Sequence, residues 1–360
     1  MSWEDNVRKV VPYIPGEQPR DDHKVIKLNT NEMPYPPSPK VTEALTAFDA
    51  ASLRLYPAPD VGPLRDALAD RYGVGTDEMF VGVGSDDVLA TAFLTFFYSD
   101  KPVIFPDITY SFYDVWCDVY RIPYETKKLD DDFHIRKEDY LCENGGIVIA
   151  NPNAPTGISE EKDISFIEDI VKANAGSVVI VDEAYVDFGG VTALPLIKKY
   201  DNVLIVRTFS KSMAFAGMRI GFAMGNSRLI KYMNDVKYSV NSYTMNRPAI
   251  ELGVAVLSDE KYYVDAVAKV VRTREWTGKE LRNRNFSVTD SKTNFVFAAP
   301  PADKISAKDL FTELKKRSIY VRWWDKDRLR DHLRISIGTD EEMQELITAI
   351  DAIIKEQGEK

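Results

Sequence analysis

The chain has 360 residues, enough for two domains of ordinary size. Hydrophobic residues make up 44% and charged residues 28%, which is the composition of a globular protein and not of a disordered one. Acidic residues outnumber basic ones by 56 to 46, and the net charge of −10 argues against a nucleic-acid-binding protein, which needs a basic face.

Cysteines, histidines and hydropathy exclude four further classes: disulfide-stapled, metal-binding, secreted and membrane-spanning proteins. Two cysteines cannot form a disulfide scaffold, and three scattered histidines have no metal-ligand spacing, so we expect no metal site. The N-terminus lacks an apolar signal-peptide core, and the densest apolar stretch, residues 88–97, is too short to span a bilayer. We therefore expect a soluble, cytoplasmic enzyme that makes no contact with membranes or nucleic acids.

Residues 1–39 predict an extended N-terminal arm. Seven prolines in this segment fix φ and bias each preceding residue away from helix. Tyr13, Ile14 and the segment 28–32 mix apolar and polar side chains that suit packing on a surface. We therefore expect the arm to be ordered.

Residues 40–246 predict a large doubly wound α/β domain. Pro63 stands at the start of an expected helix that ends at Gly73. Helices are also expected over 85–98 and 160–173. Short apolar runs between Gly, Pro or Asp residues indicate strands buried on both faces of a mostly parallel sheet. These runs cover residues 79–83, 103–105, 146–150, 178–181, 203–206 and 220–224.

Residues 247–360 predict a smaller C-terminal α+β domain. One long helix is expected from residue 250 to about residue 282, because this stretch has the helical pattern, few glycines and no proline. An antiparallel-leaning sheet and two helices should follow it. The expected strands are 286–288, 294–298, 319–322 and 333–337, and the expected helices are 308–317 and 341–355.

Two of the predicted strands are followed by groups suited to binding a ligand. The turn 82–87 could bring backbone N–H groups at a helix start to a phosphate, although a plain capped turn fits equally well. Asp182 and Glu183 end a buried strand, where α/β proteins bind ligands, and an acid there needs a nearby cation to stay ionised. A magnesium-binding nucleotidase is excluded, because the chain has no P-loop.

Lys211 follows the next strand, inside a stretch of small residues. A lysine in such a place can lose its proton and act as a nucleophile toward aldehydes, although a surface lysine is the alternative. Thr208, Ser210 and Arg219 surround it with two hydroxyls and a cation, which suits a phosphate.

Residues 151–157 form a rigid, polar turn after another predicted strand. Arg322 and Arg334 lie in predicted strands, where each could clamp a carboxylate or phosphate or could form a surface salt bridge.

In this order, the segments resemble the fold-type I pyridoxal-phosphate-dependent aminotransferases, most closely those that act on histidinol phosphate. The resemblance runs from Val-Pro-Tyr at 11–13 to Leu-Arg-Ile-Ser-Ile-Gly at 333–338. Its most specific segments are Asp-Glu-Ala-Tyr at 182–185, Arg-Thr-Phe-Ser-Lys at 207–211 and Ala-Gly-Met-Arg-Ile-Gly-Phe at 216–222.

The resemblance implies pyridoxal 5′-phosphate as cofactor and a role for each matching residue. Lys211 would bind the cofactor as a Schiff base and then carry the proton. Asp182 would pair with the protonated ring nitrogen, and Tyr185 would hydrogen-bond the ring oxygen O3′. Tyr110 would stack on the ring. The phosphate would be held by Ser85, Asp86, Thr208, Ser210 and Arg219, and by Tyr56 from the other subunit of a homodimer with shared active sites.

Two segments depart from the family pattern. The family usually has asparagine directly before Pro-Thr-Gly, where it also bonds O3′, but this chain has Ala154 there. Asn153 could compensate as a cofactor contact, or Tyr185 could act alone. Residues 32–37 also lack the usual Asn-Pro.

The resemblance implies transamination of histidinol phosphate with 2-oxoglutarate, giving imidazole-acetol phosphate and glutamate, in histidine biosynthesis. Tyr13, Arg322 and Arg334 would bind the substrate. An aromatic amino acid aminotransferase and a phosphothreonine-type decarboxylase are the alternatives, and both would share Lys211 and Asp182. A regulatory protein of this fold is disfavoured, because the chain has no spare length for a DNA-binding segment and is acidic.

Overall fold

The computed structural model describes residues 2–19, 24–160 and 163–358. Its strands are β1 (Ile26–Lys27), β2 (Met79–Gly82), β3 (Val103–Pro106), β4 (Tyr124–Lys127), β5 (Gly146–Ala150), β6 (Val179–Asp182), β7 (Val203–Thr208), β8 (Gly221–Gly225), β9 (Ser287–Val288), β10 (Phe295–Ala299), β11 (Ile319–Tyr320) and β12 (Leu333–Ser336). Its α-helices are α1 (Pro39–Ala47), α2 (Gly62–Tyr72), α3 (Gly84–Phe96), α4 (Tyr113–Tyr120), α5 (Ser165–Ala173), α6 (Ser227–Val240), α7 (Arg247–Leu257), α8 (Glu260–Asn283), α9 (Ala307–Lys316) and α10 (Asp340–Gly358).

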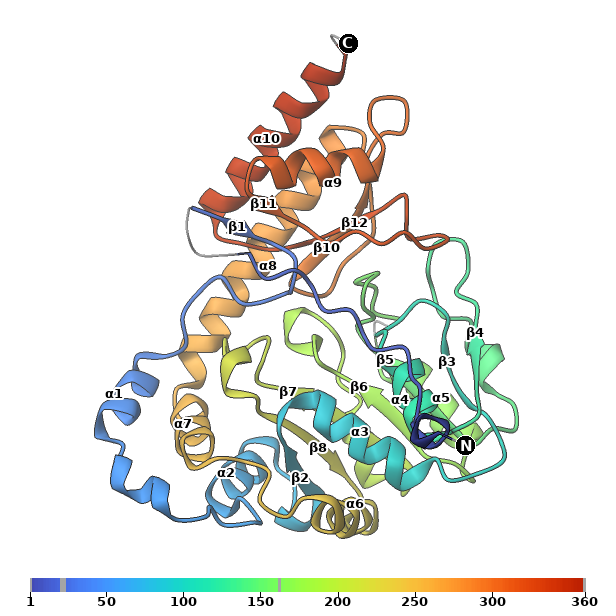
Figure 1. Ribbon diagram of the computed structural model, residues 1–360, viewed down its shortest axis with the longest axis vertical. Coiled ribbons are helices and arrows are strands. Elements are labelled where there is room, and N and C mark those ends of the chain that lie inside the picture. The colour runs from blue at the N-terminus through green and yellow to red at the C-terminus, as the bar shows by residue number, and fades with distance from the viewer. Residues whose placement is uncertain (1, 20–23, 161–162, 359–360) are drawn as a thin grey trace.

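A seven-stranded sheet with the order β2-β8-β7-β6-β5-β3-β4 forms the larger part of the molecule (Figure 1). Its strands are parallel except β8, which is antiparallel to both of its neighbours, β2 and β7. The central strands are buried along their whole length, as the apolar runs predict. The mostly parallel α/β fold is therefore confirmed.

Alternate residues of these strands enter two separate cores, one on each face of the sheet. Val148, Ile180 and Leu204 pack with the side chains of α3 and α4, whereas Ile149 and Val181 pack with those of α2, α5 and α7. This alternation follows from the two-residue period of a strand. At their carboxyl ends, β5, β6 and β7 are each followed by a loop.

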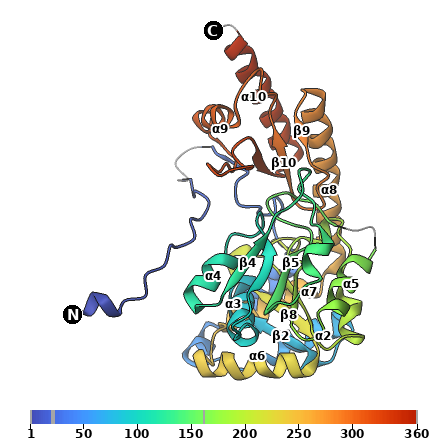
Figure 2. The same ribbon diagram turned by 90° about the vertical axis from the view of Figure 1, so that its right-hand side faces the viewer.

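A second, antiparallel sheet with the order β12-β10-β9 lies beside α8, α9 and α10 (Figure 1). The arm joins this part of the molecule, because β1 pairs in parallel with β11. Residues 2–19 of the arm run along one side of the molecule, and the first of them lie away from both sheets (Figure 2). The expected division near residue 246 remains our proposal, since α7 still packs against α1 and α2.

Three local expectations are corrected by the structure. The single helix expected over 250–282 is broken into α7 and α8, because Ser258 caps α7 and Asp259 accepts a hydrogen bond from Ser38. Strand β4 is missing from the sequence prediction, since it is an exposed edge strand without an apolar run. Helix α5 begins at Ser165, later than expected, and residues 161–162 of that prediction lie outside the described residues.

Candidate active site

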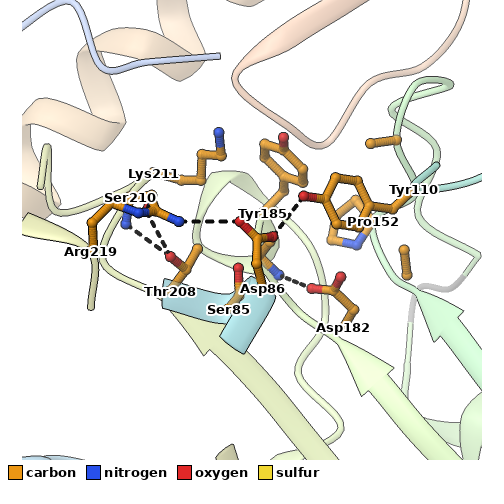
Figure 3. Close-up of a pocket in the computed structure, with 13 residues that line it drawn as sticks. Ser85, Asp86, Tyr110, Pro152, Asp182, Tyr185, Thr208, Ser210, Lys211 and Arg219 are labelled. Atoms are coloured by element: carbon orange, nitrogen blue, oxygen red, sulfur yellow. Dashed lines mark hydrogen bonds and ion pairs between the residues drawn. The ribbon is translucent and has the colours of Figure 1, made fainter. Parts of the chain in front are cut away.

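A pocket lies at the carboxyl ends of β5, β6 and β7 (Figure 3). The parallel register aligns Ala150, Asp182 and Val206, so the loops that follow these strands converge on one place. Nine of the predicted residues line the pocket, namely Ser85, Asp86, Tyr110, Asp182, Tyr185, Thr208, Ser210, Lys211 and Arg219.

One end of the pocket is built to hold an anion. The Thr208 hydroxyl donates to Ser210 Oγ at 3.0 Å, and Arg219 Nη1 donates to the same oxygen at 3.4 Å. Arg219 also pairs with Asp86, at 3.2 Å. Helix α3 starts here, and no side chain caps its first N–H groups. Backbone donors, two hydroxyls and a guanidinium together suit a phosphate group.

Two glycines allow this end of the pocket to form. Gly84 has φ +86°, and a Cβ there would lie 2.6 Å from Arg219 Nη2. A Cβ at Gly221 would lie 2.3 Å from the backbone of Gly84 and Ser85. Only glycine lets β8 approach the start of α3 so closely.

Asp182 is buried at the base of the pocket. It accepts hydrogen bonds from the Tyr113 hydroxyl at 2.8 Å and from the backbone N–H of Ala184 at 3.1 Å. Burial raises the pKa of Asp182 from its ordinary 3.8 to about 6, despite these two donors. A ligand cation beside it would favour the ionised carboxylate.

Lys211 extends from the loop after β7 toward the arm (Figure 3). Its Nζ donates to the backbone oxygens of Thr30 at 3.4 Å and Asn31 at 3.3 Å, and it lies 5.6 Å from the ring centroid of Tyr185. Within the described residues, Lys211 forms no ion pair with a carboxylate. The amine is therefore held by neutral groups, next to the tyrosine.

Tyr110 places its ring at the wall of the same pocket. Its hydroxyl donates to Asp86 Oδ1 at 2.7 Å (Figure 3). Since the hydroxyl is engaged at the rim, the ring is fixed in the orientation that faces the cavity.

Two of the predicted cofactor contacts do not line this pocket. Asn153 accepts from Thr109 at 2.9 Å and donates to the backbone oxygen of Ile108 at 2.9 Å, so its amide is committed elsewhere, and Ala154 lines the pocket instead. Tyr56 is 78% exposed and packs against Tyr243, with 4.7 Å between the ring centroids.

An adjoining cavity brings Tyr13, Arg322 and Arg334 next to Lys211. Arg334 donates to the backbone oxygen of Asn29 at 2.9 Å, while its buried Nε has no hydrogen-bond partner among the described residues. Burial lowers the pKa of Arg334. Arg322 donates to the backbone oxygens of arm residues 14 and 15, at 3.0 and 3.2 Å. Neither arginine pairs with a carboxylate in the described part of the chain.

Two contacts of the site were missed by sequence reasoning. Tyr113 bonds Asp182, and the buried Asn31 donates to the Tyr185 hydroxyl at 2.8 Å. Asn31 belongs to the arm segment whose mixed polarity predicted packing, but no spacing rule connects it to residue 185. A third feature, the buried ion pair of Glu183 with Arg207 at 2.7 Å, joins the ends of β6 and β7.

The family described as "Aminotransferase class I and II" matches residues 23–350. The chain belongs to this family. The histidinol-phosphate aminotransferase of Lactococcus lactis subsp. cremoris (strain MG1363) is 49% identical over 355 residues, covering 99% of this chain and 98% of the relative. The histidinol-phosphate aminotransferase of Clostridium botulinum (strain Okra / Type B1) is 46% identical over 352 residues, covering 98% of each chain.

Solved structures agree on the fold of this aminotransferase. Histidinol-phosphate aminotransferase from Sinorhizobium meliloti, in complex with pyridoxal-5′-phosphate, has a TM-score of 0.83 at 24% identity, over 92% of this chain and 91% of that one. L-threonine-O-3-phosphate decarboxylase from Porphyromonas gingivalis has a TM-score of 0.78 at 20% identity, over 92% and 100%. The predicted enzyme class and fold type are confirmed.

Metal clusters and membrane-spanning helices are both absent from the described residues. They contain no group of three or more His, Cys, Asp or Glu residues arranged to hold a metal ion. No helix among them combines the length and the apolar character needed to cross a membrane.

Proposed function

We propose that this aminotransferase transfers the amino group of histidinol phosphate to 2-oxoglutarate, giving imidazole-acetol phosphate and glutamate in histidine biosynthesis. The observation that carries the proposal is the full-length similarity, at 46–49% identity, to enzymes named for this substrate. The two arginines without a carboxylate partner beside Lys211 support it, because both substrates are anions.

The pocket fits pyridoxal 5′-phosphate as the cofactor. The anion-binding end suits its phosphate, and Asp182 suits its protonated ring nitrogen, since a cation there would favour the buried carboxylate. The side wall formed by Tyr110 suits the flat ring. When bound, the cofactor supplies an aldehyde and an electron-accepting ring, which is the chemistry that amino transfer requires.

The protein's own groups would do the remaining work. Lys211 Nζ would take the proton from the substrate Cα and then donate it to a second atom of the bound reactants. Arg334 would hold the carboxylate of glutamate or the phosphate of histidinol phosphate. Arg322, with Tyr13, would contact the phosphate and close the arm over the site, excluding water.

We further infer a homodimer with shared sites, acting in the cytoplasm. Tyr56 would reach the partner's phosphate. Support comes from the apolar side chains exposed around Tyr56, an area that a second subunit could cover. These side chains are Leu53 and Leu55, close to Tyr56 in the chain, and Tyr243, which packs against its ring.

A substrate panel on the purified enzyme tests the proposed function. The panel compares kcat/KM for histidinol phosphate, phenylalanine and phosphothreonine as donors, with 2-oxoglutarate as acceptor. We expect histidinol phosphate to have the highest kcat/KM and phosphothreonine to release no carbon dioxide. A preference for phenylalanine would make the enzyme an aromatic aminotransferase, and carbon dioxide release would make it a decarboxylase.

A further inference from the structure

Asn31 is the residue at which the arm, the large sheet and the small sheet meet. It is only 1% exposed, and its φ of +57° lies in the left-handed region, which asparagine tolerates better than most residues. Its backbone oxygen accepts from Lys211 and from Asn294 Nδ2, at 3.3 and 2.9 Å. Its side chain lies between Tyr185 and Ser336.

The hydrogen bonds around Asn31 fix the direction of each donor. Ser336 Oγ accepts from the Asn31 backbone N–H at 2.9 Å, so its single hydrogen is free to be donated to Asn31 Oδ1, also at 2.9 Å. Ser336 is buried, and in the opposite orientation of the amide its hydroxyl hydrogen would have no acceptor among the described residues. The amide oxygen therefore faces Ser336, and Nδ2 donates to the Tyr185 hydroxyl at 2.8 Å. Since Nδ2 can only donate, the hydroxyl oxygen of Tyr185 must accept.

This arrangement leaves the hydrogen of the Tyr185 hydroxyl without an acceptor in the described residues. The ring lines both the cofactor pocket and the adjoining cavity, so the hydrogen is available to a ligand there. The neighbouring residue Ala154 offers no side-chain donor, and the amide of Asn153 is engaged with Thr109 and Ile108. Neither of these two side chains would therefore share with Tyr185 the task of donating a hydrogen bond to the cofactor oxygen.

We propose that Asn31 is a positioning residue that turns Tyr185 into a hydrogen-bond donor toward the cofactor's ring oxygen. The inference rests on the proposed function, because it needs a cofactor in the pocket. Asn31 itself acts only through Tyr185. A hydrogen-bond donor beside the ring oxygen stabilises the negative charge of that oxygen. Without the donor, the oxygen would bind the proton that it shares with the Lys211 nitrogen more tightly. The pH midpoint of the bound cofactor's visible absorbance should then rise.

The test is a pH titration of that absorbance in the purified holoenzyme. Tyr185→Phe sets the size of the shift for complete loss of the donor. Asn31→Asp keeps the shape and the left-handed backbone but presents an acceptor, so the tyrosine would donate to it and not to the cofactor. Asn31→Gly keeps the backbone conformation and removes the amide. Asn294→Ala is the matched control, because it removes a hydrogen bond to the Asn31 backbone and leaves the amide intact.

We expect Asn31→Asp to raise the midpoint at least half as far as Tyr185→Phe, Asn31→Gly to raise it less, and Asn294→Ala to leave it unchanged. If Asn31→Asp does not fold, the Asn31→Gly and Asn294→Ala pair decides. Three results would overturn the inference. These are wild-type midpoints in both Asn31 variants, equal shifts in those variants and Asn294→Ala, or no shift in Tyr185→Phe. A wild-type protein without cofactor absorbance would overturn the proposed function as well.

Discussion

Asp182 is buried and Arg334 is half-buried next to the site, and neither has an opposite charge beside it among the described residues. Burial disfavours the charged form of each, and it moves the pKa of the carboxyl up and that of the guanidinium down. A ligand that places a cation beside Asp182 and an anion beside Arg334 would favour the charged form of both side chains. At the scale of single residues, the site is therefore shaped for a zwitterionic cofactor and an anionic substrate.

The first prediction concerns the pH dependence of stability in the cofactor-free enzyme. Because the pKa of Asp182 is raised from 3.8 to about 6, the native state keeps a proton that the unfolded chain releases between these values. The free energy of unfolding should therefore fall as pH rises through this window, by about 3 kcal/mol from this group. Urea unfolding from pH 4 to 7 should show Asp182→Asn gaining stability relative to the wild type. If the free energy of unfolding changed with pH in the same way in both proteins, this prediction would be wrong.

The second prediction separates the two arginines. Arg334→Ala should reduce kcat/KM for histidinol phosphate and for phenylalanine, since either substrate needs an anion clamp. Arg322→Ala should reduce it more for histidinol phosphate, which has a phosphate, than for phenylalanine. Loss of a charge-assisted hydrogen bond is worth about 1.5–3 kcal/mol, or roughly ten- to a hundredfold. Equal losses for both substrates in Arg322→Ala would show that this residue only holds the arm.

At the scale of elements, the anion-binding end depends on the close approach of β8 to the start of α3. Gly221→Ala should destabilise the enzyme by about 1–3 kcal/mol and weaken cofactor binding, because the new Cβ would meet backbone atoms that cannot move aside. The measurements are the thermal midpoint and the cofactor Kd. Gly217→Ala is the control, since a Cβ there meets nothing within 4 Å. Similar losses in both variants would refute the packing argument.

The sequence predicts the elements best where one local rule decides the outcome. Buried apolar runs identify the central strands. The polar residues at or shortly after their carboxyl ends, Asp182 and Lys211, therefore identify the site. Contacts between distant segments cannot be predicted in this way. The bonds of Tyr113 to Asp182 and of Asn31 to Tyr185 join residues 69 and 154 positions apart. The break between α7 and α8 likewise depends on Ser38, a residue from another helix's cap.

At the scale of the whole molecule, the site should be complete only in a homodimer. If Tyr56 serves the partner's phosphate, mixing a Lys211→Ala chain with a Tyr56→Phe chain should produce heterodimers with one intact site of two. If the two chains pair at random, about half of the dimers are heterodimers. About a quarter of all sites would then be intact. The measurement is activity after joint refolding, with each variant refolded alone as control. A fully active monomer at assay concentration would contradict the shared site.

We propose that Lys211 holds the cofactor in the pocket at the ends of β5, β6 and β7. Borohydride reduction of the purified holoenzyme, followed by peptide mapping, tests it most directly. We predict the pyridoxyl group on the peptide that contains Lys211, and its complete absence in Lys211→Ala, whose kcat should fall by orders of magnitude. A pyridoxyl group on any other lysine of the wild-type chain would contradict the claim.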